Sequence, residues 1–428
     1  MKAWLRWPAA GAALMLVLAP LVVAWLNVRG EEPLSDAVPG PAPAAQIQRG
    51  AYLAQVGNCM ACHTQAGGAP FAGGRAIDTP FGTVYSSNLT PDMQTGLGRW
   101  SPDHFWRALH HGRSRDGRLL NPAFPYTEFT RISRQDSDDL YAYLHSLPAQ
   151  SQAQPPSTLR WPLDTPWALA LWRALYFRAA DPSPQGPAGQ SAEWQRGAYL
   201  VNGLGHCGAC HTPRDRLGGL RSGEPFRGGL LPARQGYAPA LSDPAEAGVM
   251  DWPVEDIVAL LKTGINGRAV VSGPMAEVVF RSTRFLQEAD ARAMAVYLKS
   301  LPVQAARTLP VPPRWPAQLQ LGRQLYEHHC AQCHGEQGQG VPGAYPALAG
   351  NRAVAMGQPA NLVRIVLDGG YPPATPGHPR PHGMPPLRQQ LSDEEVAAVL
   401  SYVRDRWGDG AGPVSSLDLL RDRGTDGF

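Results

Sequence analysis

Apolar residues are distributed along this chain in two ways, as one continuous run near the N-terminus and as periodic segments farther on. The continuous run extends from about residue 8 to residue 26, and the basic residues Lys2 and Arg6 precede it. Roughly 18–20 apolar residues suffice for one helix across a bilayer core. A charged segment before such a run is typical of an export signal. The pattern predicts an uncleaved signal anchor over residues 1–30, with the remainder of the chain exported.

Aromatic residues at the two ends of the run agree with this prediction. Trp4, Trp7 and Trp25 occupy the positions where a membrane helix carries interfacial aromatics. A signal peptide cleaved after the run is the alternative, but residues 24–29 lack a small-x-small cleavage site.

The periodic segments repeat. The sequence RGAYL stands at residues 49–53 and again at 196–200, and a looser version, LGRQLY, stands at 321–326. Each is typical of a short amphipathic helix. A second kind of helical segment closes each repeat and carries an aromatic residue, and these aromatics are Tyr143, Tyr297 and Tyr402. The repeats predict three copies of one helical unit, in which the opening and closing helices cross at the aromatic.

Between the repeats the chain is rich in proline and contains one further apolar helix. Gly and Pro supply 46 and 43 residues, which predicts a loop-rich fold. Residues 165–177 have the pattern of a capped apolar helix that is too short to span a membrane. It packs between domains, or it contacts lipid or a partner. The predicted organisation is anchor 1–30, linker 31–45, unit one 46–150, linker 151–190, unit two 191–303, linker 304–315, unit three 316–410 and tail 411–428.

The charge of the chain excludes one class of partner. Charged residues make up 17% of the chain and the formal net charge is +3, without a basic stripe. A nucleic-acid partner is therefore not expected.

The cysteines predict the chemistry. All six occur in three C-x-x-C-H motifs, at Cys59, Cys62 and His63, at Cys207, Cys210 and His211, and at Cys330, Cys333 and His334. This is the signature of covalent haem c attachment, in which the cysteines form thioethers and the histidine binds iron. A zinc site or a redox dithiol needs no histidine after the second cysteine, so the motifs predict three covalent haems c.

Electron-carrying haems usually have a second axial ligand, and methionine opposite histidine raises the potential. In the second repeat Met275 lies in a Pro/Gly-rich segment after the motif, where a loop is expected, and Met384 has the same place in the third. Both are predicted distal ligands. His378 and His382 compete with Met384 in the third repeat.

The first repeat departs from this pattern. Internal alignment places Phe124 in the slot of Met275, and phenylalanine cannot bind iron. His111 is the preferred distal ligand, because Thr263 and Asp368 hold its position in the other repeats. The alternatives are His110, Met93, an open five-coordinate haem, His104 or His145, and a capping role for the two adjacent histidines at a helix C-terminus.

Several segments together resemble a known family. They are residues 80–92, 95–100, 122–126, 272–279 and 383–387. With the three motifs, they make the chain similar to the tri-haem cytochrome c subunits of periplasmic membrane-bound dehydrogenases. The resemblance implies a mainly α fold, with three tandem class I cytochrome c domains after the anchor helix.

It also implies a role. Such subunits accept electrons from a catalytic partner of flavin, quinoprotein or molybdenum type and deliver them to ubiquinone or another respiratory acceptor. The resemblance therefore implies an electron-transfer subunit that is not itself an enzyme, anchored to the inner membrane of a bacterium with its haem domains in the periplasm. A peroxidase-like enzyme and a subunit of a terminal oxidase are the competing functions.

Overall fold

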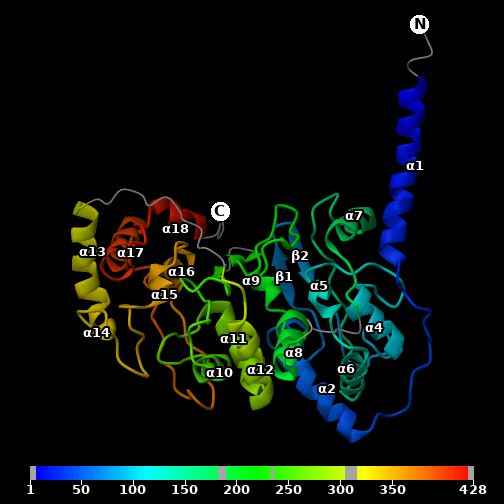
Figure 1. The fold of residues 1–428 in the computed structure, drawn as a ribbon, viewed down its shortest axis with the longest axis horizontal. Coiled ribbons are helices and arrows are strands. Elements are labelled where there is room, and N and C mark those ends of the chain that lie inside the picture. Colours follow the sequence, from blue (N-terminus) through cyan, green and yellow to red (C-terminus); the bar gives the residue numbers. More distant parts are fainter. Residues whose placement is uncertain (1–5, 182–188, 233–235, 304–315, 423–428) are drawn as a thin grey trace. The chain divides into compact units, whose positions relative to one another are not determined.

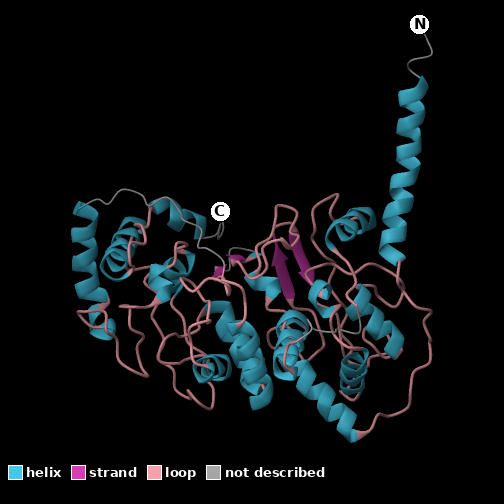
Figure 2. Cartoon of the chain, viewed as in Figure 1, coloured by secondary structure: helices cyan, strands magenta, loops and turns pink. Residues whose placement is uncertain are grey.

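The computed structural model describes residues 6–181, 189–232, 236–303 and 316–422, with side chains described from residue 15 to residue 420. Lys2, Trp4 and the predicted linker 304–315 lie outside the described residues. The described chain is mainly helical, with short strands (Figure 2). Its contacts divide it into two compact units, the first comprising Met1–Ala54, Cys59–Gln185 and Asp215–Leu220, and the second comprising Gln55–Asn58, Gly186–Arg214 and Arg221–Phe428.

The first unit contains the long N-terminal helix and the first motif (Figure 1). Its elements are α1 Arg6–Val28, most of α2 Ala44–Val56, α3 Cys59–Cys62, the antiparallel strands β1 Ala76–Thr79 and β2 Gly82–Tyr85, α4 Pro102–His111, α5 Tyr126–Phe129, α6 Arg134–His145 and α7 Pro166–Tyr176. Among the described residues, no helix reaches both the length and the hydropathy that a bilayer crossing requires.

The second unit contains the other two motifs. Its first part comprises α8 Ala192–Tyr199, the π-helix Leu200–Leu204, α9 Gly208–His211, β3 Gly229–Leu230, β4 Tyr237–Ala238, α10 Val254–Thr263, α11 Gly273–Arg281, the 3₁₀ turn Thr283–Phe285 and α12 Glu288–Lys299. Its second part comprises α13 Pro316–His329, α14 Ala331–His334, α15 Arg352–Ala355, α16 Ala360–Asp368, α17 Asp393–Trp407 and α18 Ser416–Asp422. A core of aliphatic side chains from α16 and α17 closes around Leu419 of α18.

The predicted helix crossings are confirmed in all three repeats. A Cβ atom on Gly50 of α2 would lie 1.9 Å from the carbonyl oxygen of Asp139 in α6. On Gly197 of α8 it would lie 1.9 Å from the Ala293 oxygen in α12, and on Gly322 of α13, 2.1 Å from the Ala398 oxygen in α17. In each case the nearest side-chain atom is the Cβ of the predicted tyrosine, Tyr143, Tyr297 or Tyr402. The glycines therefore let the two backbones touch where a larger residue would hold them apart.

The predicted apolar helix at 165–177 is also confirmed, as α7, whose N-cap Thr165 accepts a hydrogen bond from the Ala168 amide. Its inner face packs on α1 within the first unit. The Asn27 side chain donates to the Ala170 carbonyl at 3.0 Å and accepts from Arg173 Nε at 2.8 Å. Arg173 also lies over the rings of Tyr126 and Phe177, so its buried guanidinium is held by polar and aromatic partners.

Candidate haem-attachment sites

Each motif begins in one helical turn that has the same hydrogen bond. The backbone amides of His63, His211 and His334 donate to the carbonyls of Cys59, Cys207 and Cys330 at 3.0, 3.0 and 2.9 Å. This i to i−4 bond fixes the two cysteines and the histidine of each motif in one arrangement. The three attachment turns thus share their local geometry as well as their sequence.

The imidazole of each motif histidine is oriented by a second bond. Nδ1 of His63 lies 2.7 Å from the Ser87 carbonyl oxygen, Nδ1 of His211 lies 2.7 Å from that of Pro239, and Nδ1 of His334 lies 2.9 Å from that of Pro346. A carbonyl can only accept, so Nδ1 carries the proton and Nε2 keeps its lone pair. Metal-binding histidines have this arrangement of partners. The donor set therefore fits a haem iron at Nε2.

These three carbonyls were not predicted from the sequence, although a signal is present. The acceptor stands two residues before a leucine in every repeat, in Ser87-Asn-Leu89, Pro239-Ala-Leu241 and Pro346-Ala-Leu348. This motif is short beside the longer repeats that surround it. Aligning the three repeats from their C-x-x-C-H motifs would reveal it.

The thiols of the first cysteine in each motif keep their protons near neutral pH. Burial raises the pKa of the Cys59 and Cys207 thiols to about 12, and that of Cys330 to about 11. A metal-binding cysteine needs the opposite shift, because the thiolate is the ligand. Within the described residues, no three side chains of His, Cys, Asp or Glu are grouped to hold a metal ion.

The two predicted methionine ligands lie in different local structures. Met275 is half-buried in the first turn of α11, two residues after the left-handed Gly273, so its setting is a helix start where the sequence suggested a loop. Met384 is in an extended segment that pairs with Gly370, its amide donating to the Gly370 carbonyl at 2.8 Å. Part of its side chain packs on the core around α16 and α17.

The competing histidines of the third repeat have distinct surroundings. The His382 ring packs 5.1 Å from the Tyr345 ring, between centroids. His378 is inaccessible at both ring nitrogens, and neither has a hydrogen-bond partner in the described part of the chain. His378 therefore stays open as an alternative ligand.

In the first repeat the slot of Met275 is occupied by an aromatic cluster. The Phe124 ring lies 5.3 Å from the Phe129 ring and 6.4 Å from the Tyr126 ring, between centroids. Tyr126 is fully buried and begins the short helix α5. This slot therefore contributes packing and no sulfur.

The end of α4 gathers the preferred candidate and its neighbour. His110 stacks on Trp106 at 4.4 Å between ring centroids, and its ring lies edge-on to that of His111 at 4.7 Å. Burial and then the neighbouring His110 and Arg173 lower the pKa of His111 to about 4. His111 is therefore a neutral imidazole near pH 7, the form that can donate a lone pair to iron.

The other candidates of this repeat occupy settings of their own. Met93 is 56% exposed, in a loop held by Asp92, whose carboxylate accepts from the amides of Gln94 and Thr95. His104 accepts the Ser101 amide in a capping box at the start of α4. The His145 ring packs 4.0 Å from that of Tyr141, between centroids. The structure thus brings His110 and His111 together, and leaves Met93 on the surface.

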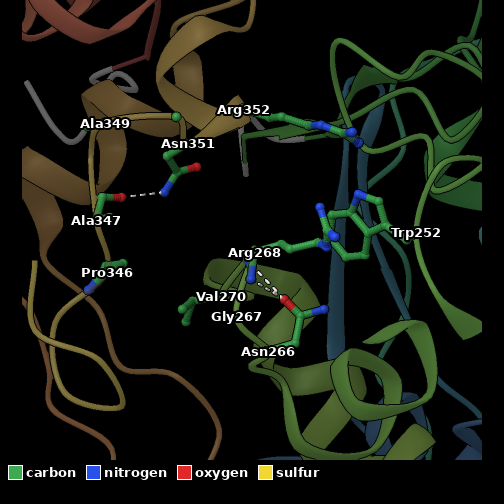
Figure 3. Close-up of a pocket in the computed structure, with 12 residues that line it drawn as sticks. Trp252, Asn266, Gly267, Arg268, Val270, Pro346, Ala347, Ala349, Asn351 and Arg352 are labelled. Atoms are coloured by element: carbon green, nitrogen blue, oxygen red, sulfur yellow. Dashed lines mark hydrogen bonds between the residues drawn. The ribbon is translucent and has the colours of Figure 1, made fainter. Parts of the chain in front are cut away.

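A cavity of about 380 Å³ in the second unit reaches the backbone segment that orients one motif histidine (Figure 3). It is lined by Pro346, whose carbonyl accepts from His334, and by Trp252, whose ring centroid lies 5.9 Å from the guanidinium carbon of Arg268 and 5.5 Å from that of Arg352. Each arginine is paired with a carboxylate outside the lining, Asp256 or Asp251. Each of the two guanidinium groups that line the cavity is therefore balanced by one carboxylate.

Comparison with known proteins agrees with these features. The cytochrome c family model matches residues 47–148 and 319–407. The cytochrome c subunit of alcohol dehydrogenase (quinone) from Gluconobacter oxydans strain 621H is 38% identical, over 89% of this chain and 83% of that protein. The gluconate 2-dehydrogenase cytochrome c subunit of Pantoea cypripedii is 38% identical, over 86% of this chain and 87% of that protein. The fructose dehydrogenase cytochrome subunit of Gluconobacter japonicus is 32% identical, over 92% and 86%.

The helical fold and the oriented C-x-x-C-H turns define a c-type cytochrome. The chain belongs to the family of cytochrome c subunits of dehydrogenase complexes. The resemblance to cytochrome c subunits of dehydrogenases is thereby confirmed, and so is the prediction of an electron-transfer subunit whose substrate chemistry takes place on a partner chain.

Proposed function

We propose that the chain carries three covalent haems c and passes electrons from a periplasmic dehydrogenase to ubiquinone or another respiratory acceptor. The thioethers form at Cys59, Cys62, Cys207, Cys210, Cys330 and Cys333. His63, His211 and His334 are the proximal ligands, each in its own domain within 46–150, 191–303 or 316–410.

One observation carries this proposal, namely the bond from Nδ1 of each motif histidine to a backbone carbonyl at 2.7–2.9 Å. Haem c supplies a one-electron couple at iron. The protein supplies orientation, because the carbonyl holds the imidazole plane and directs Nε2 away from the backbone. The same bond in three repeats supports three haems, where the family model matches only two segments of the chain.

The distal ligands divide the haems into two kinds. Met275 and Met384 serve the second and third haems, for which a thioether ligand favours a higher potential. His111 serves the first haem, with His110 and Met93 as alternatives. The depressed pKa of His111 supports this choice, since no proton has to leave before the imidazole binds iron.

The relatives suggest the kind of partner. Their names refer to an alcohol, gluconate or fructose dehydrogenase, and one names a quinone. A dehydrogenase of flavin, quinoprotein or molybdenum type is therefore the proposed electron donor, and a membrane quinone the proposed acceptor. Substrate chemistry takes place on the partner chain.

The proposed anchor is α1, which places the subunit on the inner membrane with its haem domains in the periplasm. The helix runs for 23 residues, and Met15, Leu16 and Leu21 expose 71%, 76% and 60% of their surface. Exposed aliphatic side chains in a row are costly in water and favourable in lipid. Arg29 lies over the Trp25 ring, the pair expected at a membrane surface.

The haem count is tested by attachment. The full chain, expressed with a cytochrome c maturation system, is expected to show three haems per polypeptide by pyridine haemochrome and by intact mass. Replacing both cysteines of one motif by alanine, in three separate variants, should remove one haem each. A parent protein with two haems, or a motif whose loss leaves the count unchanged, would contradict the proposal.

The electron-transfer role is tested with the native complex. An affinity-tagged chain is isolated from its own membranes in mild detergent, with the co-purifying subunit identified by mass spectrometry. Ethanol, gluconate, fructose, an aldehyde and an N-heterocycle are then added singly, and haem reduction is followed optically. Reduction by one substrate class, and reoxidation by a soluble ubiquinone analogue, is expected. A complex without a dehydrogenase subunit, or with haems that no substrate reduces, would refute the role.

A further inference from the structure

Helix α7 has an outward face that the proposed function does not use. Trp167, Leu171 and Leu175 recur every four residues along it, and 71%, 52% and 61% of their surfaces are exposed. Residues four apart lie on one face of a helix. Trp161 and Leu163, in the segment before the helix, are exposed as well. We call these five residues the α7 stripe.

The opposite face of α7 is fixed to the protein. Arg173 is buried and binds Asn27 of α1 and the Gly112 carbonyl. Trp172 donates to the Leu217 carbonyl at 3.0 Å, and Tyr176 donates to the Asp215 carboxylate at 2.7 Å. The helix is therefore attached on the sides away from the α7 stripe, and the apolar face is left outward. Large exposed apolar patches mark interaction sites.

From this geometry we infer that the α7 stripe lies in the membrane surface, as a second lipid contact beside the anchor. The inference rests on the proposed membrane location of α1. The α7 helix is 11 residues long, which suits an interfacial helix and not a spanning one. Tryptophan and leucine on the apolar face are typical of helices that lie in the headgroup region.

Continuity with α1 identifies lipid as the occupant. Asn27, near the end of α1, binds the Ala170 carbonyl in the middle of α7, and Figure 1 shows α7 beside that end of α1. Trp25 and Arg29, the interfacial pair of α1, stand within two residues of Asn27. The α7 helix is thus held next to the residues of α1 that belong at the membrane surface.

The charged residues around the α7 stripe also favour lipid as its occupant. The α7 stripe contains no acidic residue, and the exposed Arg160 and Arg178 flank it at the two ends. Arginines at the ends of an apolar face attract anionic headgroups. Asp164 is the one exposed carboxylate between these arginines. A protein partner would bury the same leucines, so the two occupants have to be distinguished by experiment.

The test is photo-crosslinking of the full chain in vesicles of phosphatidylethanolamine and phosphatidylglycerol. The photoreactive amino acid p-benzoylphenylalanine is placed at Leu171 or, as a second variant, at Leu175. Both side chains are more than half exposed, so the replacement leaves the packing intact. Gln94, an exposed polar residue of the same unit, is the matched control position, and Leu18 of α1 reports on the anchor. Intact haem spectra confirm folding of every variant.

Lipid adducts at Leu171 and Leu175, several-fold more abundant than at Gln94 by mass spectrometry, are the expected result. Lipid adducts at Leu18 with none at either α7 position would overturn this inference and leave the anchor standing. Lack of adducts at Leu18 and at both α7 positions would overturn the two together. A cross-link from Leu171 to a second copy, or to the dehydrogenase in the native complex, in place of lipid would show a protein interface and overturn the lipid contact.

Discussion

The first and second haem-attachment regions have the same scaffold and different distal sides. In both, a glycine of the opening helix touches a backbone carbonyl of the closing helix, so closely that a Cβ atom on either glycine would lie 1.9 Å from the carbonyl oxygen. In both, the motif histidine binds a carbonyl at 2.7 Å. The part of each repeat that carries the C-x-x-C-H motif and the helix crossing therefore has nearly the same geometry in the two regions.

The part of each repeat that carries the candidate distal ligand differs between the two regions. The second region carries Met275 at the start of the nine-residue helix α11, whereas the first has Phe124 in an aromatic cluster before the four-residue helix α5. At the end of the preceding helix, Thr263 bonds back to the Ala259 carbonyl, while His111 lies buried near Arg173. The difference teaches that the attachment turn and the candidate distal ligands lie in separate parts of the repeat, so one can change without the other.

The largest effect is expected from breaking what the two regions share. Gly197→Ala would put a methyl group against the Ala293 carbonyl, and the backbones of α8 and α12 would have to separate. Overpacking that moves side chains and backbone in this way typically costs about 1–3 kcal/mol, and this contact of two backbones is expected at the upper end. The free energy of unfolding, from denaturant titration of the holoprotein, measures it. Gly50→Ala should cost a similar amount.

Gly223→Ala is the matched control, because a Cβ there meets no atom within 4 Å. Equal unfolding midpoints for Gly197→Ala and Gly223→Ala would show that the crossing tolerates a side chain.

The next largest effect is expected on haem reduction potentials, from substitutions at the position where the second region has Met275 and the first has Phe124. Met275→Leu should lower the potential of one haem, and Phe124→Met should raise that of another, each by an amount on the order of 0.1 V, within the ~0.8 V that axial ligands span. Optical redox titration resolves the haems. Phe124→Leu controls for the loss of the ring. If Phe124→Met and Phe124→Leu have the same potentials, the sulfur does not reach the iron.

A smaller effect is expected on the pH dependence of stability, which should differ between the first turn of α4 and the corresponding turn of α10. His104 accepts the Ser101 amide through Nδ1, so the capping bond needs the neutral ring, and burial lowers the pKa of His104. The corresponding turn of α10 carries Glu255 and Asp256 instead. The contribution of His104 to folding stability is fully present above the ordinary histidine pKa of about 6.5. It is lost as the pH falls through the pKa of His104 in the folded state, which is lower.

As pH falls from about 7.5 through the lowered folded pKa of His104, the first turn of α4 should therefore lose stability, by up to about 1 kcal/mol, the usual contribution of a helix cap. Amide hydrogen exchange should show this in α4 and not in α10. Asp36, Asp103, Arg107 and Arg115 are the charged groups that influence His104. In His104→Gln the pH dependence should disappear, and a pH response unchanged by that substitution would assign it to another group.

The smallest effect compares two ion pairs at the crossings. Arg49 binds Asp139 at 2.8 and 3.2 Å, and Arg196 binds Asp290 at 2.8 and 2.7 Å. The Asp139 side chain is 2% exposed and that of Asp290 is 11% exposed. Both arginines reach into solvent, which screens the charges and keeps the contribution of each pair to stability small.

Double-mutant cycles with Asp→Asn and Arg→Gln should give the larger coupling energy for the Arg49–Asp139 pair, because its carboxylate is the less hydrated. The reverse order would show that burial does not set their strength.

Local and repeated features were predictable from the sequence. The three attachment turns, the crossing at Tyr143, Tyr297 and Tyr402, and α7 with its Thr165 cap all depend on residues near one another or on a pattern present three times. The capping box of Ser392 and Glu395 in α17 was predictable in the same way.

Features made by distant residues were not predictable. The acceptor carbonyls are backbone atoms, which any residue type provides, so their position depends on the path of the loop and leaves only a weak trace in sequence. The contact of Asn27 with Arg173 joins residues 146 positions apart. Neither side chain belongs to a periodic pattern that would pair them. The helix start at Met275 also differs from the expected loop, because Pro274 is compatible with both and proline is favoured in a first helical turn.

The bond between Asn27 and Arg173 has a mechanical consequence. A carrier attached to its membrane only through the extended segment after α1 would sweep a wide volume, and its encounters with a membrane-bound acceptor would depend on the length of that segment. With α1 as the proposed anchor, the bonds from Asn27 at the end of α1 to α7 would make the first unit turn and tilt together with that anchor. On that proposal the fold would set the height of the first attachment site above the bilayer, and encounters with a membrane-bound acceptor would depend on lateral diffusion in two dimensions.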